Sequence, residues 1–439
     1  MKPDDALEFH RRNFPGNGKL EVIPKVPLRD RRDLSLAYTP GVAEPCRRIA
    51  EDEREVYEYT AKGNLVAVVS DGSRVLGLGD IGPSAALPVM EGKALLFKHF
   101  GGVDAFPVVV DVHEPDAIID VVKAMAPTFG GVNLEDIASP KCFYILEKLR
   151  EELSIPVFHD DQQGTGLVVL AALINALKVV GKRMDNVTVT MFGAGAAGFA
   201  TLRILTRAGV RPGNVRVVEM VGGRPRVLTE DMPLDELFPY RGWLLEKTNS
   251  DGVEGGPAEA LKGSDVLISF TRPGPGVILP EWIEGMAEDA VVFPLANPVP
   301  EILPEEALRA GARIVATGRS DYPNQVNNVL GFPGVFRGAL DVRASRISDG
   351  MIVEAARALA SVVGEPDEEH ILPSPLDPVA TATVAEAIAM EAMREGVARR
   401  KVRQGYVREH ALLLRRYYEE SIVPLNEKRK LWREELGEG

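Results

Sequence analysis

The stretch that decides the fold is Val187-Thr188-Val189-Thr190-Met191-Phe192-Gly193-Ala194-Gly195-Ala196-Ala197-Gly198. Its first half is β-branched and apolar, which predicts a buried strand, and three glycines follow with the spacing G-x-G-x-x-G. A helical pattern then runs from Phe199 to Ala208, and a second strand, Val215 to Val218, ends at Glu219, 21 residues after the last glycine. Strand, glycines, helix, strand and terminal acid together are typical of a βαβ unit that binds a dinucleotide.

This unit predicts a Rossmann-type domain and the contacts of a nicotinamide cofactor. The glycines let the backbone approach the pyrophosphate, and the helix amino terminus supplies positive potential. Glu219 should accept hydrogen bonds from both ribose hydroxyls and repel a 2′-phosphate, which favours NAD. Arg224 and Arg226 follow closely and could compensate, so NADP stays open. The residues expected to contact the cofactor are Thr165, Gly193, Ala194, Gly195, Ala196, Ala197, Gly198, Glu219, Thr271 and Asn297.

Three further strand patterns continue this rhythm and lead into polar residues. The strands and the polar residues after them are Asp265 to Phe270 with Thr271, Ala290 to Ala296 with Asn297, and Arg313 to Gly318 with Asn327 and Asn328. A nicotinamide and a substrate bind at the carboxyl ends of such strands. Asn327 and Asn328 precede a helical pattern, and helix capping is an equally good interpretation for one of them.

A second group of candidate functional residues lies between Asn133 and Gly166. Two pairs of adjacent carboxylates stand there, Glu135-Asp136 and Asp160-Asp161, and the second pair follows an apolar, strand-like stretch. Carboxylates beside such a strand are costly to bury without a positive partner. All-oxygen ligands suit a hard divalent cation, Mg²⁺ or Mn²⁺. The competing interpretation is that these acids cap helices or stand in solvated loops.

Three other residues are candidates for catalysis or substrate binding. Lys93 lies on or beside the apolar stripe of a helical pattern from Pro88 to Phe100, so it either reaches solvent or is desolvated, with a lowered pKa, and acts as a base. Arg74 precedes a glycine-rich bend and is either a solvated turn residue or a carboxylate ligand. Tyr38 lies in Leu34 to Ala43, a predicted strand that runs into a Thr-Pro-Gly turn, where a packed ring is the commoner outcome.

The composition limits the class of protein. A chain of 439 residues with a net charge of −13 has no bulk attraction to nucleic acid. The six histidines show no paired zinc-ligand spacing. The two cysteines, Cys46 and Cys142, lie far apart, and we find neither a signal peptide nor an apolar run of membrane-spanning length. These features predict a cytoplasmic protein with no structural disulfide and no membrane partner.

The length and the patterns together predict an α/β fold of two domains with a helical C-terminal segment. We assign residues 1–164 to a substrate and metal domain and residues 165–345 to a Rossmann domain with a doubly wound parallel sheet. Residues 346–439 form the C-terminal segment, with helical patterns from Ile347 to Val363 and from Val379 to Met393. The Arg- and Glu-rich tail after Arg399 is expected to pack on the other domain or on a second subunit.

Eight motifs carry a resemblance to a known family: Arg32 to Ala43, Tyr59 to Asn64, Val75 to Gly82, Met90 to Lys93, Phe129 to Ile137, Phe158 to Thr165, Gly318 to Asn328 and Phe332 to Arg343. On these motifs the chain resembles the malic enzymes, in particular their short bacterial and archaeal form. The resemblance implies Tyr38 as general acid and Lys93 as general base. It implies Glu135, Asp136 and Asp161 as metal ligands, with Asp160 holding Lys93 or supporting the ligands. It also implies that Arg74, Asn297 and Asn327 or Asn328 contact substrate or nicotinamide.

The activity implied by the resemblance is the oxidative decarboxylation of (S)-malate to pyruvate and CO₂, with reduction of NAD or NADP and with Mg²⁺ or Mn²⁺, in a homodimer or higher homo-oligomer. Lys93 would take the C2 hydroxyl proton, and Tyr38 would protonate C3 after decarboxylation. Two alternatives stay open, a malolactic-type decarboxylase that does not release reduced cofactor, and a dinucleotide-binding protein without turnover. A two-domain amino-acid dehydrogenase fits the fold but leaves the acid pairs without a purpose.

Overall fold

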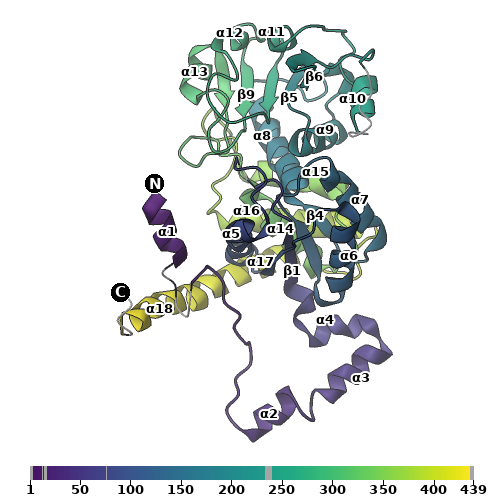
Figure 1. Cartoon of the computed structure of the whole chain (residues 1–439), viewed down its shortest axis with the longest axis vertical. Helices are drawn as coiled ribbons and strands as arrows, with labels where there is room; N and C mark the ends of the chain where they lie inside the picture. Colours follow the sequence, from purple (N-terminus) through teal and green to yellow (C-terminus); the bar gives the residue numbers. More distant parts are fainter. Residues whose placement is uncertain (1–2, 12, 14–16, 76, 233–239, 436–439) are drawn as a thin grey trace.

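The computed structural model describes residues 3–11, 13, 17–75, 77–232 and 240–435 of the chain. The body of the molecule has two parts, placed one above the other in Figure 1, and each is built around a sheet of parallel strands. The predicted α/β fold, with a Rossmann-type domain and a second α/β domain, is confirmed.

The four-stranded sheet forms the centre of the substrate domain. Its strands, in the order β2-β1-β3-β4, are β2 (Asp104–Val109), β1 (Leu65–Ser70), β3 (Gly131–Leu134) and β4 (Val157–His159). All three pairings are parallel, so helices must connect the strands. These helices are α5 (Pro83–Gly101), α6 (Pro115–Met125) and α7 (Lys141–Glu152). Both acid pairs therefore follow the carboxyl ends of neighbouring strands, β3 and β4.

The six-stranded sheet forms the centre of the cofactor domain. Its strands, in the order β10-β9-β8-β5-β6-β7, are β10 (Ala312–Val315), β9 (Ala290–Pro294), β8 (Val266–Ser269), β5 (Val189–Phe192), β6 (Val215–Val221) and β7 (Arg224–Val227). Only β7 is antiparallel, and the sequence patterns did not predict it. Gly222 and Gly223, with φ angles of 59° and 78°, form the two-residue turn between β6 and β7, a conformation that favours glycine.

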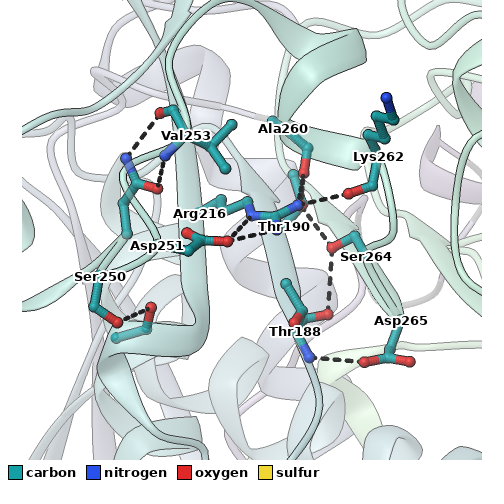
Figure 2. A network of polar contacts seen from close by, with 12 residues as sticks. Thr188, Thr190, Arg216, Ser250, Asp251, Val253, Ala260, Lys262, Ser264 and Asp265 are labelled. Atoms are coloured by element: carbon teal, nitrogen blue, oxygen red, sulfur yellow. Dashed lines mark hydrogen bonds and ion pairs between the residues drawn. The ribbon is translucent and has the colours of Figure 1, made fainter.

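A network of polar contacts fastens the sheet where β5 and β6 begin (Figure 2). The Arg216 guanidinium of β6 donates to Asp251 at 2.6 Å and to the carbonyl oxygens of Ala260 and Lys262 at 2.9 and 2.8 Å. Thr190 of β5 donates to the same Ala260 carbonyl at 2.8 Å. These contacts lie at the amino-terminal ends of the strands, and the glycine loop lies at their carboxyl ends. The contacts therefore stabilise the fold and do not belong to the cofactor site.

The C-terminal part of the chain returns to the substrate domain. Its helices are α14 (Phe332–Asp341), α15 (Asp349–Val362), α16 (Pro378–Arg394), α17 (Tyr406–Tyr417) and α18 (Val423–Glu435). The first of these packs on α5, although it lies inside the range 165–345 expected for the cofactor domain. His410 of α17 bonds to Asp341 at 2.8 Å, and Arg415 donates to the His99 carbonyl oxygen at 3.1 Å. The domain boundaries at 164 and 345 stay predictions.

Helix α1 (Pro3–Arg11) stands beside the body in Figure 1. The remaining helices of the body are α8 (Thr165–Val179), α9 (Ala196–Ala208), α10 (Arg241–Lys247), α11 (Pro257–Leu261), α12 (Pro280–Ile283) and α13 (Pro304–Arg309). The short helical segments are η1 (Glu53–Glu55), η2 (Ala61–Asn64), η3 (Ala126–Thr128), η4 (Asp160–Gly164), η5 (Pro212–Asn214), η6 (Asn328–Leu330) and η7 (Tyr418–Ile422). The long α8 packs on both α9 and α15. It therefore links the two parts of the body.

The segment before β1 forms an arm that projects from the body (Figure 1). It contains α2 (Arg31–Ala37), α3 (Ala43–Glu51) and α4 (Val56–Tyr59), none of whose residues, all of them described, is buried. The strand predicted over Leu34 to Ala43 is wrong. Asp30 caps α2 by accepting from the Asp33 amide at 2.8 Å, and neither sheet of the described chain includes residues of this part of the arm.

One described helix is long and apolar enough to cross a membrane. It runs from Asp160 to Val179, and 78% of its most apolar stretch is buried inside the protein. The expectation that the chain has no apolar run of this length is therefore wrong. Because its side chains pack against the rest of the molecule, it is a core helix.

Candidate active site

The buried amine of Lys93 lies at the centre of the candidate site. Lys93 stands on α5, and its Nζ lies 2.6 Å from Asp160 Oδ2 and 2.9 Å from Glu135 Oε1. The amine also lies 4.5 Å from the ring centroid of Phe332 on α14. Three separate elements therefore enclose the amine, so its position is held from several sides.

The three acids expected to bind a metal do come together. Oxygens of Glu135, Asp136 and Asp161 all lie within 4.8 Å of one another. Asp136 has a φ angle of 54°, and its amide donates to Asp161 Oδ2 at 3.0 Å, which joins the two loops. Asn133 of β3 is completely buried and donates to Glu135 Oε2 at 2.8 Å. The donor set consists of carboxylate oxygens, which suits a hard divalent cation.

The charges of this cluster shift the pKa values of its members. Burial raises the pKa of Glu135 and of Asp161, and neighbouring acids raise that of Glu135 further. Burial opposes the charge on Lys93, but Asp160 and Glu135 together outweigh it and raise the pKa of the amine above its usual value. The expected lowering of the Lys93 pKa is therefore wrong for this structure. One ammonium cannot neutralise four acids, and the excess negative charge is what a cation would relieve.

Asn328 and Thr165 support Asp160 from the cofactor side. The Asn328 amide donates to Asp160 Oδ2 at 3.0 Å and to Thr165 Oγ1 at 3.2 Å. Thr165 is the first residue of α8. Asn327, by contrast, caps η6 by accepting from the Val329 amide at 3.0 Å. The structure thus gives one asparagine of the pair to capping and the other to the Lys93 site.

The turn that carries Arg74 lies against the acid cluster. The Arg74 amide donates to the Asp136 carbonyl oxygen at 3.0 Å. Burial raises the pKa of Asp161, and the charges of Lys93 and Arg74 offset part of that rise. Completely buried Asp71 accepts from the amide and hydroxyl of Ser73 at 3.1 and 2.6 Å, which shapes the turn. Arg74 itself is exposed, so it can meet a substrate carboxylate.

The predicted cofactor loop lines a cavity of about 860 Å³. Gly193, Ala194, Gly195, Glu219 and Thr271 contribute to its wall, as do residues that the sequence patterns did not indicate: Ser139, Pro140, Leu228, Arg241, Arg272 and Trp282. Ala196 and Ala197 open α9 just behind this wall. Added to Gly198, a Cβ would lie 2.0 Å from the Gly193 carbonyl oxygen, so only glycine allows this helix to pack there. Ser139 and Pro140, three and four residues after Asp136, connect the loop of the first acid pair to the wall of the cavity.

Glu219 lines this cavity, whereas Asn297 does not. Glu219 accepts a hydrogen bond from the Ala194 amide, within the glycine loop. Asn297 is exposed, outside the cavity wall, and its side chain lies over Gly318. A Cβ on Gly77 of the substrate domain would lie only 3.1 Å from the Asn297 carbonyl oxygen. The glycine-rich bend therefore marks a close approach of the two domains.

The structure does not bring Tyr38 to this cluster. Tyr38 follows α2 with 69% of its surface exposed, on the arm that Figure 1 shows projecting away from α5. The sequence reading also missed Asn133 and Glu301, both completely buried. Asn133 stands two residues before Glu135, which is the strand spacing for a shared face and could have indicated it. Glu301 had no such signal.

This fold and this site are those of a two-domain α/β enzyme that binds a nicotinamide dinucleotide and carries a cluster of acids. Residues 17–150 match the family described as "Malic enzyme, N-terminal domain", and residues 162–217 and 264–397 match "Malic enzyme, NAD binding domain". The chain belongs to the malic enzyme family and is an NAD(P)-dependent, decarboxylating oxidoreductase.

Similar proteins extend the match over most of the chain. The bifunctional malic/malolactic enzyme of Bacillus subtilis is 50% identical over 402 residues, which cover 90% of this chain and 94% of that protein. The NAD-dependent malic enzyme of Geobacillus stearothermophilus is 51% identical over 87% of this chain and 78% of its own length. The crystal structure of malic enzyme from Pyrococcus horikoshii is 71% identical, covers 98% of this chain and 100% of its own, and superposes with a TM-score of 0.96.

Proposed function

We propose that this protein converts (S)-malate to pyruvate and CO₂ with Lys93 as general base and Tyr38 as general acid. The observation that carries the proposal is the position of Lys93. Its amine is buried between Asp160 and Glu135, beside the cluster of acids that Glu135 forms with Asp136 and Asp161. Dinucleotide binding alone does not require a buried amine that forms ion pairs with two carboxylates.

Glu135, Asp136 and Asp161 would hold the divalent cation, Mg²⁺ or Mn²⁺. Asn133 Oδ1 and Asp160 Oδ1 are buried nearby and have no hydrogen-bond partner among the described residues. Buried polar atoms normally have partners, so these two fit a site that takes further ligands such as water. When bound, such a cation acts as a Lewis acid on the oxygens of the substrate.

Lys93 Nζ takes the proton of the malate C2 hydroxyl. A base must be neutral when it accepts a proton, yet both carboxylates beside Lys93 favour its charged form. Glu135 is shared, because it is also a ligand of the proposed cation. Once Glu135 serves as that ligand, Asp160 remains to orient the amine, held in turn by Asn328.

Tyr38 reaches the site from a second copy of the chain. The arm carries a series of exposed apolar side chains: Val22, Ile23, Val26, Leu28, Leu34, Leu36, Tyr38, Val42 and Tyr59. A segment that exposes so many apolar side chains is suited to contact with another protein surface. In a symmetric dimer each arm would lie on the other copy, which delivers Tyr38 to the Lys93 of the partner. Arg74 would bind a malate carboxylate there.

NAD is the preferred cofactor. Glu219 stands at the wall of the cavity, close to the glycine loop, where an acid accepts from the ribose hydroxyls. Arg226 lies directly across the β-hairpin from Glu219. Both arginines of the hairpin, Arg224 and Arg226, are exposed. This arrangement supports NAD over NADP, and the assay below compares the two.

The cytoplasm is the proposed location. Cys46 is exposed, Cys142 is buried, and both are free thiols. Free thiols persist in a reducing compartment.

The test is absorbance at 340 nm with malate and Mn²⁺, run in parallel with NAD and NADP, with pyruvate assayed in the same tubes. Equal amounts of reduced cofactor and pyruvate, formed faster with NAD, are the expected result. Lactate without free reduced cofactor would instead establish the malolactic reaction. Dinucleotide binding without any product would contradict the proposal.

A further inference from the structure

Glu301 is a completely buried carboxylate that lies at the carboxyl ends of strands β8 and β9 in the cofactor domain. Its Oε1 accepts from the Ser269 hydroxyl at 2.7 Å and from the Thr271 amide and hydroxyl at 3.0 and 3.2 Å. Its Oε2 accepts from the Ala296 amide at 3.0 Å. All four groups are donors, which matches the acceptor-only chemistry of an ionised carboxylate. Among the residues that the structure describes, no lysine, arginine or histidine forms an ion pair with Glu301.

The carboxylate ties together the ends of two neighbouring strands. Ser269 ends β8, and Ala296 follows β9 and immediately precedes Asn297. The backbone of Glu301 adds to this link, because its carbonyl oxygen accepts from the Val277 and Ile278 amides, both at 3.2 Å. The Glu301 side chain therefore holds both the loop that follows β8 and the loop that follows β9.

The loop after β8 lines one half of the cofactor cavity. Thr271 lines the cavity, and its methyl carbon lies 3.6 Å from the place where a Cβ on Gly193 would stand. In the sheet, β8 and β9 lie on one side of β5, while β6, with Glu219, lies on the other. A dinucleotide lies across the crevice between such halves. Since Glu219 marks the adenosine half, the Thr271 loop held by Glu301 borders the nicotinamide half.

We infer that Glu301 is a positioning residue for the nicotinamide half of the cofactor, acting through Thr271 and the Ala296–Asn297 turn; this rests on the dinucleotide occupying the cavity as proposed above. A buried charge is expensive unless donors surround it. An apolar side chain could fill the same space, but it could not hold four donors in fixed directions.

The test compares the binding of a whole cofactor with the binding of half of it. Calorimetry on the full chain, without malate or metal, measures the affinities of NAD⁺ and of ADP, which lacks the nicotinamide half. The Glu301→Gln variant places an NH₂ group against a buried donor, so we expect about tenfold weaker NAD⁺ binding and unchanged ADP binding. Glu219→Gln should weaken the binding of both NAD⁺ and ADP. Exposed Glu305 provides the charge-matched control, Glu305→Gln, which should weaken neither.

If Glu301 only stabilised the fold, Glu301→Gln would weaken the binding of NAD⁺ and of ADP equally. That result would overturn the inference, as would unchanged binding of both ligands. Should Glu301→Gln not fold, Ser269→Ala removes a single donor, and we expect the same selective loss, about threefold. Equal affinities of wild-type protein for NAD⁺ and ADP would also overturn it. The wild-type protein could bind NAD⁺ without turning over malate, and Glu301→Gln could still lose NAD⁺ affinity selectively. That result would support the inference and contradict the proposed activity.

Discussion

Lys93 Nζ and Asp160 Oδ2 lie 2.6 Å apart, although 67 residues separate them in the chain. The Asp160 side chain is completely buried and also accepts from Asn328. The Asn328 amide holds the Asp160 carboxylate on one side, and Lys93 bonds to it on the other. The carboxylate therefore fixes the direction of the Lys93 amine. This relationship makes Asp160 the residue on which the orientation of the proposed base depends.

Asp160→Asn should reduce kcat by about 10- to 100-fold, the usual cost of losing a group that supports an active-site residue. The amide removes the charge that holds Lys93, while Arg74 and the three proposed metal ligands keep their places, so KM for malate should change little. Steady-state kinetics with malate varied at saturating Mn²⁺ measures the two constants. Glu288→Gln removes an exposed carboxylate and serves as the control. An unchanged kcat would contradict the role of Asp160.

Tyr38→Phe and Lys93→Ala variants should each be inactive alone and active when mixed. If the arm of one copy completes the site of the other, a heterodimer of the two variants contains one intact site. An equal mixture that exchanges subunits freely should then regain about a quarter of wild-type activity. Activity after co-refolding is the measurement, and a doubly substituted chain mixed with wild type is the control. No recovery in verified heterodimers would place Tyr38 in its own protomer or outside the site.

Gly77→Ala should raise KM for malate by a few fold. A Cβ there would lie 3.1 Å from the Asn297 carbonyl oxygen and 3.2 Å from Pro298 Cδ, tighter than ordinary contacts. The two domains must separate slightly, and small displacements of binding groups are costly. The matched control is Gly364→Ala, because Gly364 has open space around it. Equal kinetic constants for both variants would show that the domains do not need this close approach.

The stability of the metal-free protein should depend on His159. Burial lowers the pKa of His159 to about 4, below its value in the unfolded chain. The unfolded state therefore takes up a proton first as pH falls, so this contribution to stability is present above about pH 6.5 and is lost towards pH 4, by about 3 kcal/mol. Urea unfolding of wild type and His159→Gln at several pH values isolates the effect. A difference between them that does not vary with pH would contradict it.

The local sequence determined the parts of the structure that depend on neighbouring residues. The strand, glycines and helix from Val189 to Ala208, and the acid at Glu219, could be predicted because periodicity and backbone geometry act within one βαβ unit. The acid pairs could be predicted as a cluster, because carboxylates beside an apolar strand need a positive partner; the structure shows that they meet because β3 and β4 are adjacent parallel strands. Arm residues 34–43 show the limit of such reasoning, since an apolar pattern forms a strand only beside another strand.

Only the tertiary structure decided which distant groups meet. It paired Lys93 with Asp160, assigned Asn328 to Asp160 and Asn327 to a cap, and placed Glu301 beneath two loops. It also raised the pKa of Lys93, where burial alone would have lowered it. The physical reason is that charge–charge energies depend on separation in space and on burial, and both follow from how α5, the two sheets and α14 pack together.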